Sequence, residues 1–266
     1  MRFVYWLIIC GFISCGFLSA CATNSPVESK PIPERGDRSS ANQLAKNDFD
    51  RMADVELAEN TQSLRLLMTK LYKRNPHELA KSTSDPAEKM VDWIFDGELQ
   101  HHFQFKEIDN KQGTDAIFLA FDANYQGDRV LPFIVGLHTM LLKAHGNKKE
   151  FFLTDSINPQ HIYNVARNIE IAAWKLYTSR DANGNLYLIS NELSNTERNL
   201  SFEREFGKMI GRTDLYAISL AEKSQRLISR VIQSIATAVF LPFKHVKYLI
   251  FIVNLRGASP FLSGLF

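Results

Sequence analysis

The sequence VLPFIVGLHTMLL, residues 130–142, is the most apolar stretch of the domain-forming part of the chain and contains no charged side chain. It is too short to span a bilayer, which takes about 20 residues. A helix that is apolar on nearly all sides is typical of the centre of a helical bundle. We therefore expect residues 130–142 to form the central helix, with His138 as a hydrogen-bonded core histidine.

Apolar side chains at three- and four-residue steps predict the helices around this centre. The first runs from Asp48 to about Arg74, where the pair Asn75–Pro76 ends it. Its apolar stripe contains Asn60, which we expect to be a satisfied polar group between helices. The next helix is expected to begin at Asp85–Pro86, with Asp85 as the cap and Pro86 as the first residue, and to end at Gly97. Further helices are expected over 114–123, from 159 to a loop at 180–195, over 196–210 and over 214–241.

The helix expected over 214–241 has an apolar stripe that should face the bundle, made of Leu215, Ile218, Ile228, Val231, Ile232, Ile235 and Val239. Residues 99–105 fit either a short strand or more helix, and 186–189 fit a brief strand. The sequence thus predicts an all-α fold. It is an irregular multi-helix bundle after a disordered N-terminal linker, with at most a minor short hairpin.

Charge and cysteine usage exclude several function classes. The 266 residues carry a net charge of +2, so no strong field favours nucleic acid, and we expect no nucleic-acid partner. The three cysteines are Cys10, Cys15 and Cys21, so the rest of the chain has no thiol for a disulfide, a zinc site or a nucleophile. Without a Gly-x-Ser-x-Gly elbow or a phosphate-binding glycine loop, the sequence predicts no catalytic residue and no cofactor.

Residues 1–20 have the parts of an export signal. Residues 1–2 supply a positive charge, residues 3–17 are apolar, and small residues follow. The sequence Leu18-Ser19-Ala20-Cys21 then resembles the bacterial lipobox at every position.

This resemblance to bacterial lipoproteins implies that Cys21 takes a diacylglycerol thioether, that residues 1–20 are cleaved, and that the new amine is acylated, for example by palmitate. Two or three acyl chains on one residue give stable anchoring, so the membrane is an expected partner. Ala22 stands where such lipoproteins carry Asp for inner-membrane retention, which implies the periplasmic side of the outer membrane.

The chain divides into four parts on composition. After the signal peptide at 1–20, residues 21–44 hold the lipidated Cys and a polar, proline-containing linker that spans about 25–30 Å as a coil. Residues 45–243 form the helical domain. The basic and apolar tail at 244–266 fits a second membrane contact, a segment docked on the bundle, or an altered reading-frame end.

Two stretches of the domain are similar to uncharacterised proteobacterial lipoproteins. They are residues 60–76, which contain Leu-Tyr-Lys-Arg-Asn-Pro at 71–76, and Phe-Phe-Leu-Thr-Asp-Ser at 151–156. The similarity implies no activity and adds no site residue.

Arg167, Glu170 and Trp174 are the candidate binding residues, because Trp, Tyr and Arg dominate binding surfaces. The alternative is a half-buried helix with Arg167 and Glu170 as an internal ion pair. A calcium candidate has Asp181, Asn183, Asn185 and Glu192 at EF-hand-like spacing. Gly184 stands at loop position 4 rather than 6, however, and Asn183–Gly184 is also a favoured turn between strands.

The anchor, the tether and the bundle together predict an envelope lipoprotein that faces the periplasm. Its helical domain is expected to act as a non-enzymatic binding or scaffold module for an envelope protein partner. The alternative is an envelope hydrolase acting on lipid or cell wall, with a site that the fold assembles from histidine and carboxylate side chains.

Overall fold

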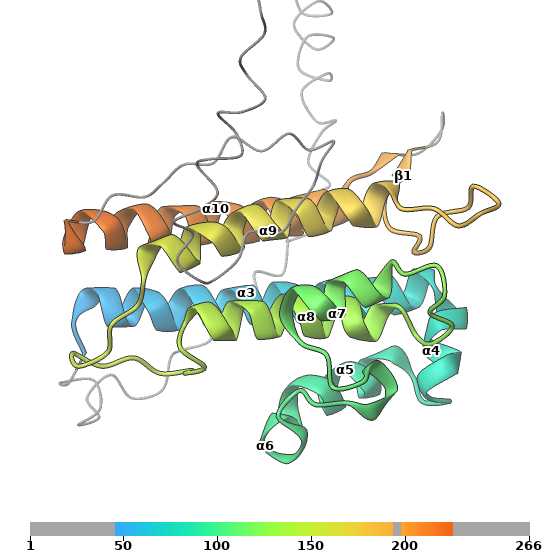
Figure 1. The fold of residues 1–266 in the computed structure, drawn as a ribbon, viewed down its shortest axis with the longest axis horizontal. Coiled ribbons are helices and arrows are strands. Elements are labelled where there is room, and N and C mark those ends of the chain that lie inside the picture. The colour runs from blue at the N-terminus through green and yellow to red at the C-terminus, as the bar shows by residue number, and fades with distance from the viewer. Residues whose placement is uncertain (1–45, 194–197, 226–266) are drawn as a thin grey trace, which may run out of the picture. The chain divides into compact units, whose positions relative to one another are not determined.

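The computed structural model describes residues 46–193 and 198–225, and Figure 1 shows their arrangement. Several predicted features lie outside these residues. They are the signal peptide, Cys21, the linker, the part of the 214–241 apolar stripe beyond Gln225, and the tail.

The all-α fold expected from the sequence is confirmed. The only strands in the described ranges are the two-residue β1 (Glu192–Leu193) and β2 (Arg198–Asn199), which pair antiparallel with Glu192 opposite Asn199. The helices are α3 (Asp48–Arg74), α4 (Pro76–Ser82), α5 (Ala87–Asp96), α6 (Glu98–His101), the 3-10 helix η1 (Lys106–Ile108), α7 (Gly113–Ala120), α8 (Val130–Ala144), α9 (Pro159–Thr178) and α10 (Ser201–Ser224).

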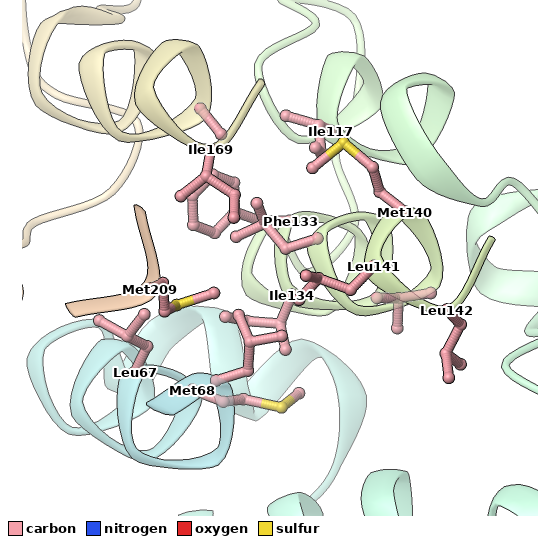
Figure 2. Packing of buried hydrophobic residues seen from close by; sticks show 14 of the residues in the cluster. Leu67, Met68, Ile117, Phe133, Ile134, Met140, Leu141, Leu142, Ile169 and Met209 are labelled. Atoms are coloured by element: carbon pink, nitrogen blue, oxygen red, sulfur yellow. The ribbon is translucent and has the colours of Figure 1, made fainter. Parts of the chain in front are cut away.

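Helix α8 occupies the centre, as its sequence predicts. Every side chain of α8 except that of Lys143 is buried, and the helix contacts α3, α7 and α9. Helices α9 and α10 pack together on one side, and α10 also packs on α3 (Figure 1). Figure 2 shows side chains that meet in this core, among them Leu67 and Met68 of α3, Ile117 of α7, Phe133 and Ile134 of α8, Ile169 of α9 and Met209 of α10.

Helix α7 approaches α8 closely because position 136 lacks a side chain. A Cβ atom at Gly136 would lie 2.6 Å from the carbonyl oxygen of Gly113 and 2.6 Å from Cγ1 of Ile117. Gly113 itself has a φ of 58°, a left-handed conformation that glycine adopts without strain. These two glycines let the short helix α7 lie directly on the central helix.

A buried polar cluster holds the start of α8. The carboxylate of Asp128 accepts hydrogen bonds from the backbone N–H of Val130 (2.8 Å), the hydroxyl of Tyr72 (2.6 Å) and the hydroxyl of Ser82 (2.8 Å). Burial raises the pKa of Asp128 while these hydrogen bonds oppose the rise, and burial beside Asp128 raises the pKa of Tyr72 well above its usual value. Because every bond satisfies a group that would otherwise be orphaned, we assign this cluster to the fold.

The C-terminal helices differ from the expectation. A single helix, α10, replaces the break expected between 210 and 214, so the two-helix prediction is wrong in the described range. Leu215 and Ile218, expected to face the bundle, are 62% and 45% exposed. The buried face of α10 instead includes the polar side chain of Thr213.

Two smaller predictions differ from the structure, and one open alternative is resolved. Helix α5 begins at Ala87 with Pro86 as its cap, one residue later than predicted. The alternatives for 99–105 resolve into the short helix α6, followed by His102 and Phe103 with φ values of 51° and 55°. The brief strand expected at 186–189 is a single bridge between Leu186 and Arg180.

Candidate functional site: two buried histidines and two cavities

His145, at the C-terminal cap of α8, belongs to a buried polar network. Its Nδ1 lies 2.9 Å from the carbonyl oxygen of Leu141, and because a carbonyl only accepts, Nδ1 carries the hydrogen. Its Nε2 lies 3.0 Å from Oε2 of Glu56, an ion-pair distance without the alignment of a hydrogen bond. The ring also stacks on that of Tyr216, with centroids 5.9 Å apart and planes at 5°.

Glu56 connects His145 to α10. Its Oε1 accepts hydrogen bonds of 2.6 Å from the hydroxyl of Thr213 and 2.6 Å from the amide of Asn60. The Arg212 guanidinium donates to the amide oxygen of Asn60 at 2.9 Å, which confirms that Asn60 is a satisfied polar group between helices. The network therefore joins α3, the end of α8 and α10, and we assign it to stability.

His138, two turns earlier on α8, has no such partners. Only 2% of its surface is exposed, yet neither ring nitrogen has a hydrogen-bond partner within the described part of the chain. The prediction that His138 lies in the core is therefore confirmed, and the prediction that it is hydrogen-bonded is wrong. The neighbours of the ring are aromatic, with the centroids of Phe95 and Phe103 at 5.2 Å and 4.6 Å.

Burial dominates the chemistry of this imidazole. Burial and, to a lesser degree, charge repulsion from the nearby ammonium of Lys149 together lower the pKa of His138 to about 3. His138 is therefore neutral at physiological pH, with one N–H donor and one acceptor nitrogen.

His138 lines a cavity of about 270 Å³ between α3, α5, α6 and α8. Its apolar wall comes from Leu57, Phe95 and Leu142. Its charged wall comes from Asp54, Arg65, Asp96, Glu98 and Lys149.

All five of these charged side chains are paired with protein groups. Arg65 contacts Asp96 at 2.6 Å, Lys149 contacts Glu98, and Asp54 contacts Lys46 at 2.6 Å. Among the buried polar groups of this lining, the one without a hydrogen-bond partner is thus His138.

A second and larger cavity, of about 690 Å³, lies on another side of α5. Trp93 of α5 lines it and is 49% exposed, with the ring of Phe105 at 5.4 Å. Lys81, Lys89, Asp85, Asp92 and Glu107 supply its polar wall. This size is ordinary for a small-molecule or peptide side-chain pocket.

The residues predicted as a binding cluster on α9 include an ion-paired arginine. Arg167 contacts Glu170 at 3.0 Å, contacts Asp214 of α10, and lies 5.2 Å from the ring centroid of Tyr163. Burial raises the pKa of Glu170, Arg167 opposes the rise, and Asp214 adds to it. Trp174 is half-buried one turn further along α9. Arg167 thus serves as a link between α9 and α10.

The predicted calcium loop is organised by hydrogen bonds within the chain. The Asp181 carboxylate accepts from the backbone N–H of Asn183 (2.9 Å) and Asn185 (2.8 Å), which lowers the pKa of Asp181. Gly184 has a φ of 85°, as a tight turn requires, and Glu192 lies in β1. Among residues 46–193 and 198–225, no group of three or more His, Cys, Asp or Glu side chains is placed to hold a metal ion.

Sequence reasoning missed both cavities and the network around Glu56. Glu56 and Thr213 are separated by 157 positions, so no local pattern joins them. A faint signal was available for His138, which is the only titratable residue in an otherwise apolar stretch.

Comparisons with protein-family models, with curated proteins and with solved structures found no match. In the described ranges, no helix is both long and apolar enough to cross a membrane.

Proposed function

We propose that this protein is a lipid-anchored protein of the bacterial envelope whose helical domain binds a partner at the Trp93 cavity. The anchoring half rests on the sequence Leu18-Ser19-Ala20-Cys21 behind an apolar run. Acylation of Cys21 would hold the domain on the periplasmic side of the outer membrane, with residues 22–44 as a tether.

One observation carries the binding half, namely a half-exposed tryptophan in a 690 Å³ cavity. Tryptophan is enriched among residues that contribute most to binding because it offers a large rigid apolar surface. The cavity also has charges of both signs, including Glu107, which suit the polar rim of an interface with an envelope protein.

A hydrolase acting on lipid or cell wall is the second candidate, favoured by the presence of His138 and three carboxylates in one cavity. Two facts weigh against it. A histidine with a pKa of about 3 is a poor general base near neutral pH. The carboxylates Asp54, Asp96 and Glu98 are already engaged by cations.

The anchor is tested by Cys21→Ser with fractionation and intact mass measurement. The wild type should pellet with membranes and carry added lipid mass, and the variant should carry none. A variant that still pellets, with a native protein that has no lipid mass, would contradict the anchor.

The binding site is tested by placing a photo-crosslinking amino acid at Lys89, on the rim of the Trp93 cavity, in living cells. The matched control places it at Leu215 on α10, which is 62% exposed. We expect a reproducible protein captured from position 89, lost in the Trp93→Ala background and not captured from position 215. Failure to capture any reproducible protein from position 89 would contradict a protein partner.

A further inference from the structure

We propose that the outward face of α10 binds the same face of a second copy of this chain, with the two helices antiparallel. Neither the Cys21 anchor nor the Trp93 cavity enters this interface. Six exposed residues make up the outward face, and at 3.6 residues per turn they fall within a strip of α10 about 80° wide. They are Arg204, Gly207, Gly211, Leu215, Ile218 and Glu222.

Two large apolar side chains lie at the middle of this face. Leu215 is 62% exposed and Ile218 is 45% exposed. They are three residues apart on the helix, so they point to the same side. The opposite side of α10 carries buried residues such as Phe206 and Met209 and packs on α9 and α3. Leu215 and Ile218 therefore form an apolar centre that the described part of the chain leaves exposed.

Two glycines leave recesses beside this apolar centre. A Cβ atom at Gly207 or Gly211 would meet nothing within 4 Å beyond the helix's own backbone, as far as the described residues go. Packing inside the chain therefore does not require glycine at either position, although glycine weakens a helix relative to alanine. At Gly136, by contrast, a Cβ atom would lie 2.6 Å from a neighbouring carbonyl oxygen. The recesses of α10 instead allow another helix to approach closely.

The recesses and the apolar side chains are arranged symmetrically about position 213. Gly211 and Leu215 lie two positions on either side of it. Gly207 and Ile218 lie six and five positions away from it. In an antiparallel pair centred there, Leu215 of one copy faces Gly211 of the other, and each large side chain meets a recess. A parallel pair would place leucine against leucine and leave the recesses empty.

The charges at the two ends of the face favour the same orientation. Arg204 and Glu222 lie nine positions on either side of 213, so the antiparallel pair brings opposite charges together at both ends. The Arg204 side chain is 68% exposed, although its Nε lies 3.5 Å from Oε1 of Glu205. Lys208, at the edge of the face, already contacts Glu205 at 3.0 Å. A parallel pair would set like charges against each other at each end.

The length of the face sets the expected strength of the contact. From Arg204 to Glu222 it extends about 27 Å along one helix. We expect such a pair to bury less than about 1,200 Å², which is the range of transient complexes. The dissociation constant should therefore be on the order of 100 µM.

Sedimentation equilibrium of the full chain in detergent, with micelles in excess, measures this dissociation constant. Leu215→Glu should raise it at least about tenfold, because a charge would be buried in an apolar contact. Leu99→Glu is the matched control, since Leu99 of α6 is 86% exposed and lies outside the face, and it should change the constant less than about twofold. A wild type that stays monomeric at about 300 µM, or equal effects of the two variants, would overturn the proposal.

Gly211→Leu separates the interface from the fold. Its side chain would extend into open space in the single chain, and leucine favours a helix more than glycine does, so the thermal stability of the monomer should not fall. The same side chain would fill the recess that receives Leu215 of the second copy, so the dissociation constant should rise at least about tenfold. Unchanged dimerisation of Gly211→Leu would overturn the proposal.

Charge reversal tests the ends of the face. Glu222→Arg places like charges together at both ends and should raise the dissociation constant about fivefold. Adding Arg204→Glu to the same chain exchanges the two charges and should restore the constant to within about twofold of the wild type. A double variant that dimerises no better than Glu222→Arg would overturn the antiparallel pairing.

A photo-crosslinking amino acid at position 215 tests the orientation directly, in a mixture of ¹⁴N-labelled and ¹⁵N-labelled chains. We expect crosslinks of mixed label between the tryptic peptide 213–223 of one copy and the tryptic peptide 209–212 of the other, which contains Gly211. Mixed-label crosslinks from 213–223 to 213–223 would indicate a parallel pair and overturn the proposal. Crosslinks of a single label alone would show that the chain covers its own face, and would overturn it as well.

Discussion

His138 and His145 lie seven residues apart, two turns along the same helical path, and both are buried, but their surroundings differ in kind. His145 has a carbonyl, a carboxylate and a stacked tyrosine around it. His138 has two phenyl rings and a cavity. The comparison teaches that burial alone does not assign a role to a histidine. The role follows from whether the protein itself supplies the partners.

The largest expected effect comes from removing the centre of the His145 network. Glu56→Ala leaves the hydroxyl of Thr213 and the amide of Asn60 without their shared acceptor in a buried site. We expect the free energy of unfolding in urea to fall by about 3–5 kcal/mol. Glu59→Ala, an exposed neighbour on α3, should change it by less than about 0.5 kcal/mol. Similar losses of unfolding free energy in both variants would contradict the structural role assigned to the buried network.

The pH dependence of stability should carry the signature of His138. Its pKa is about 3 in the folded chain and 6.5 in the unfolded chain, so below pH 6.5 the unfolded chain takes up a proton that the folded chain does not. The contribution of neutral His138 to the free energy of unfolding is therefore fully present above pH 6.5 and declines as the pH falls below this value. The contribution of this group to the unfolding free energy should fall by about 2 kcal/mol between pH 6.5 and about pH 5.

The control for this titration is His138→Leu, measured by urea unfolding over the same pH range. Its curve should lack the His138 contribution and otherwise follow that of the wild type. Superimposable pH dependences of the two proteins would show that His138 titrates normally.

A smaller effect sharpens the comparison between network and cavity. Thr213→Val removes one hydroxyl that donates to Glu56 and should cost about 1–2 kcal/mol of unfolding free energy. Thr61→Val, in the lining of the His138 cavity, removes a hydroxyl that only back-bonds to the Leu57 carbonyl within α3. Because such back-bonding contributes little, we expect a change within about 0.5 kcal/mol. Thermal melts of the two variants check this order, and a larger loss of stability in Thr61→Val than in Thr213→Val would contradict it.

The smallest effect is expected at Asp181, an exposed residue whose carboxylate accepts hydrogen bonds from the backbone N–H groups of Asn183 and Asn185. Asp181→Ala should speed amide hydrogen exchange at residues 183 and 185 and leave that of α8 unchanged. Calorimetry with calcium tests the alternative role of the same loop. Heat in the wild type that disappears in Asp181→Ala would support a calcium site, and no heat in either would remove it.

The sequence predicted the elements that depend on local pattern. The bounds of α3 and the burial of α8 follow from apolar spacing and from the Asn75–Pro76 stop. The break expected inside α10 was wrong because packing on α9 and α3 and the hydrogen bond from Thr213 to Glu56 favour a continuous helix.

The candidate sites were less accessible to sequence reasoning. Whether His138 finds a partner depends on Phe95, Phe103 and Lys149, which come from other parts of the chain. Leu215 and Ile218 fit an apolar stripe, yet the helix turns its other face to α9 and α3. Periodicity identifies a face but not the neighbour that covers it.

The most direct test of the account is the sign of two stability changes measured side by side at neutral pH, for His145→Leu and His138→Leu. His145→Leu removes the ion-pair contact of the buried Glu56 carboxylate and the hydrogen bond to the Leu141 carbonyl, and should lower the free energy of unfolding by about 3 kcal/mol. His138→Leu removes an unpaired buried polar group and should raise it by about 1 kcal/mol. Changes of opposite sign are the predicted result, and a comparable loss of stability in both variants would contradict the account.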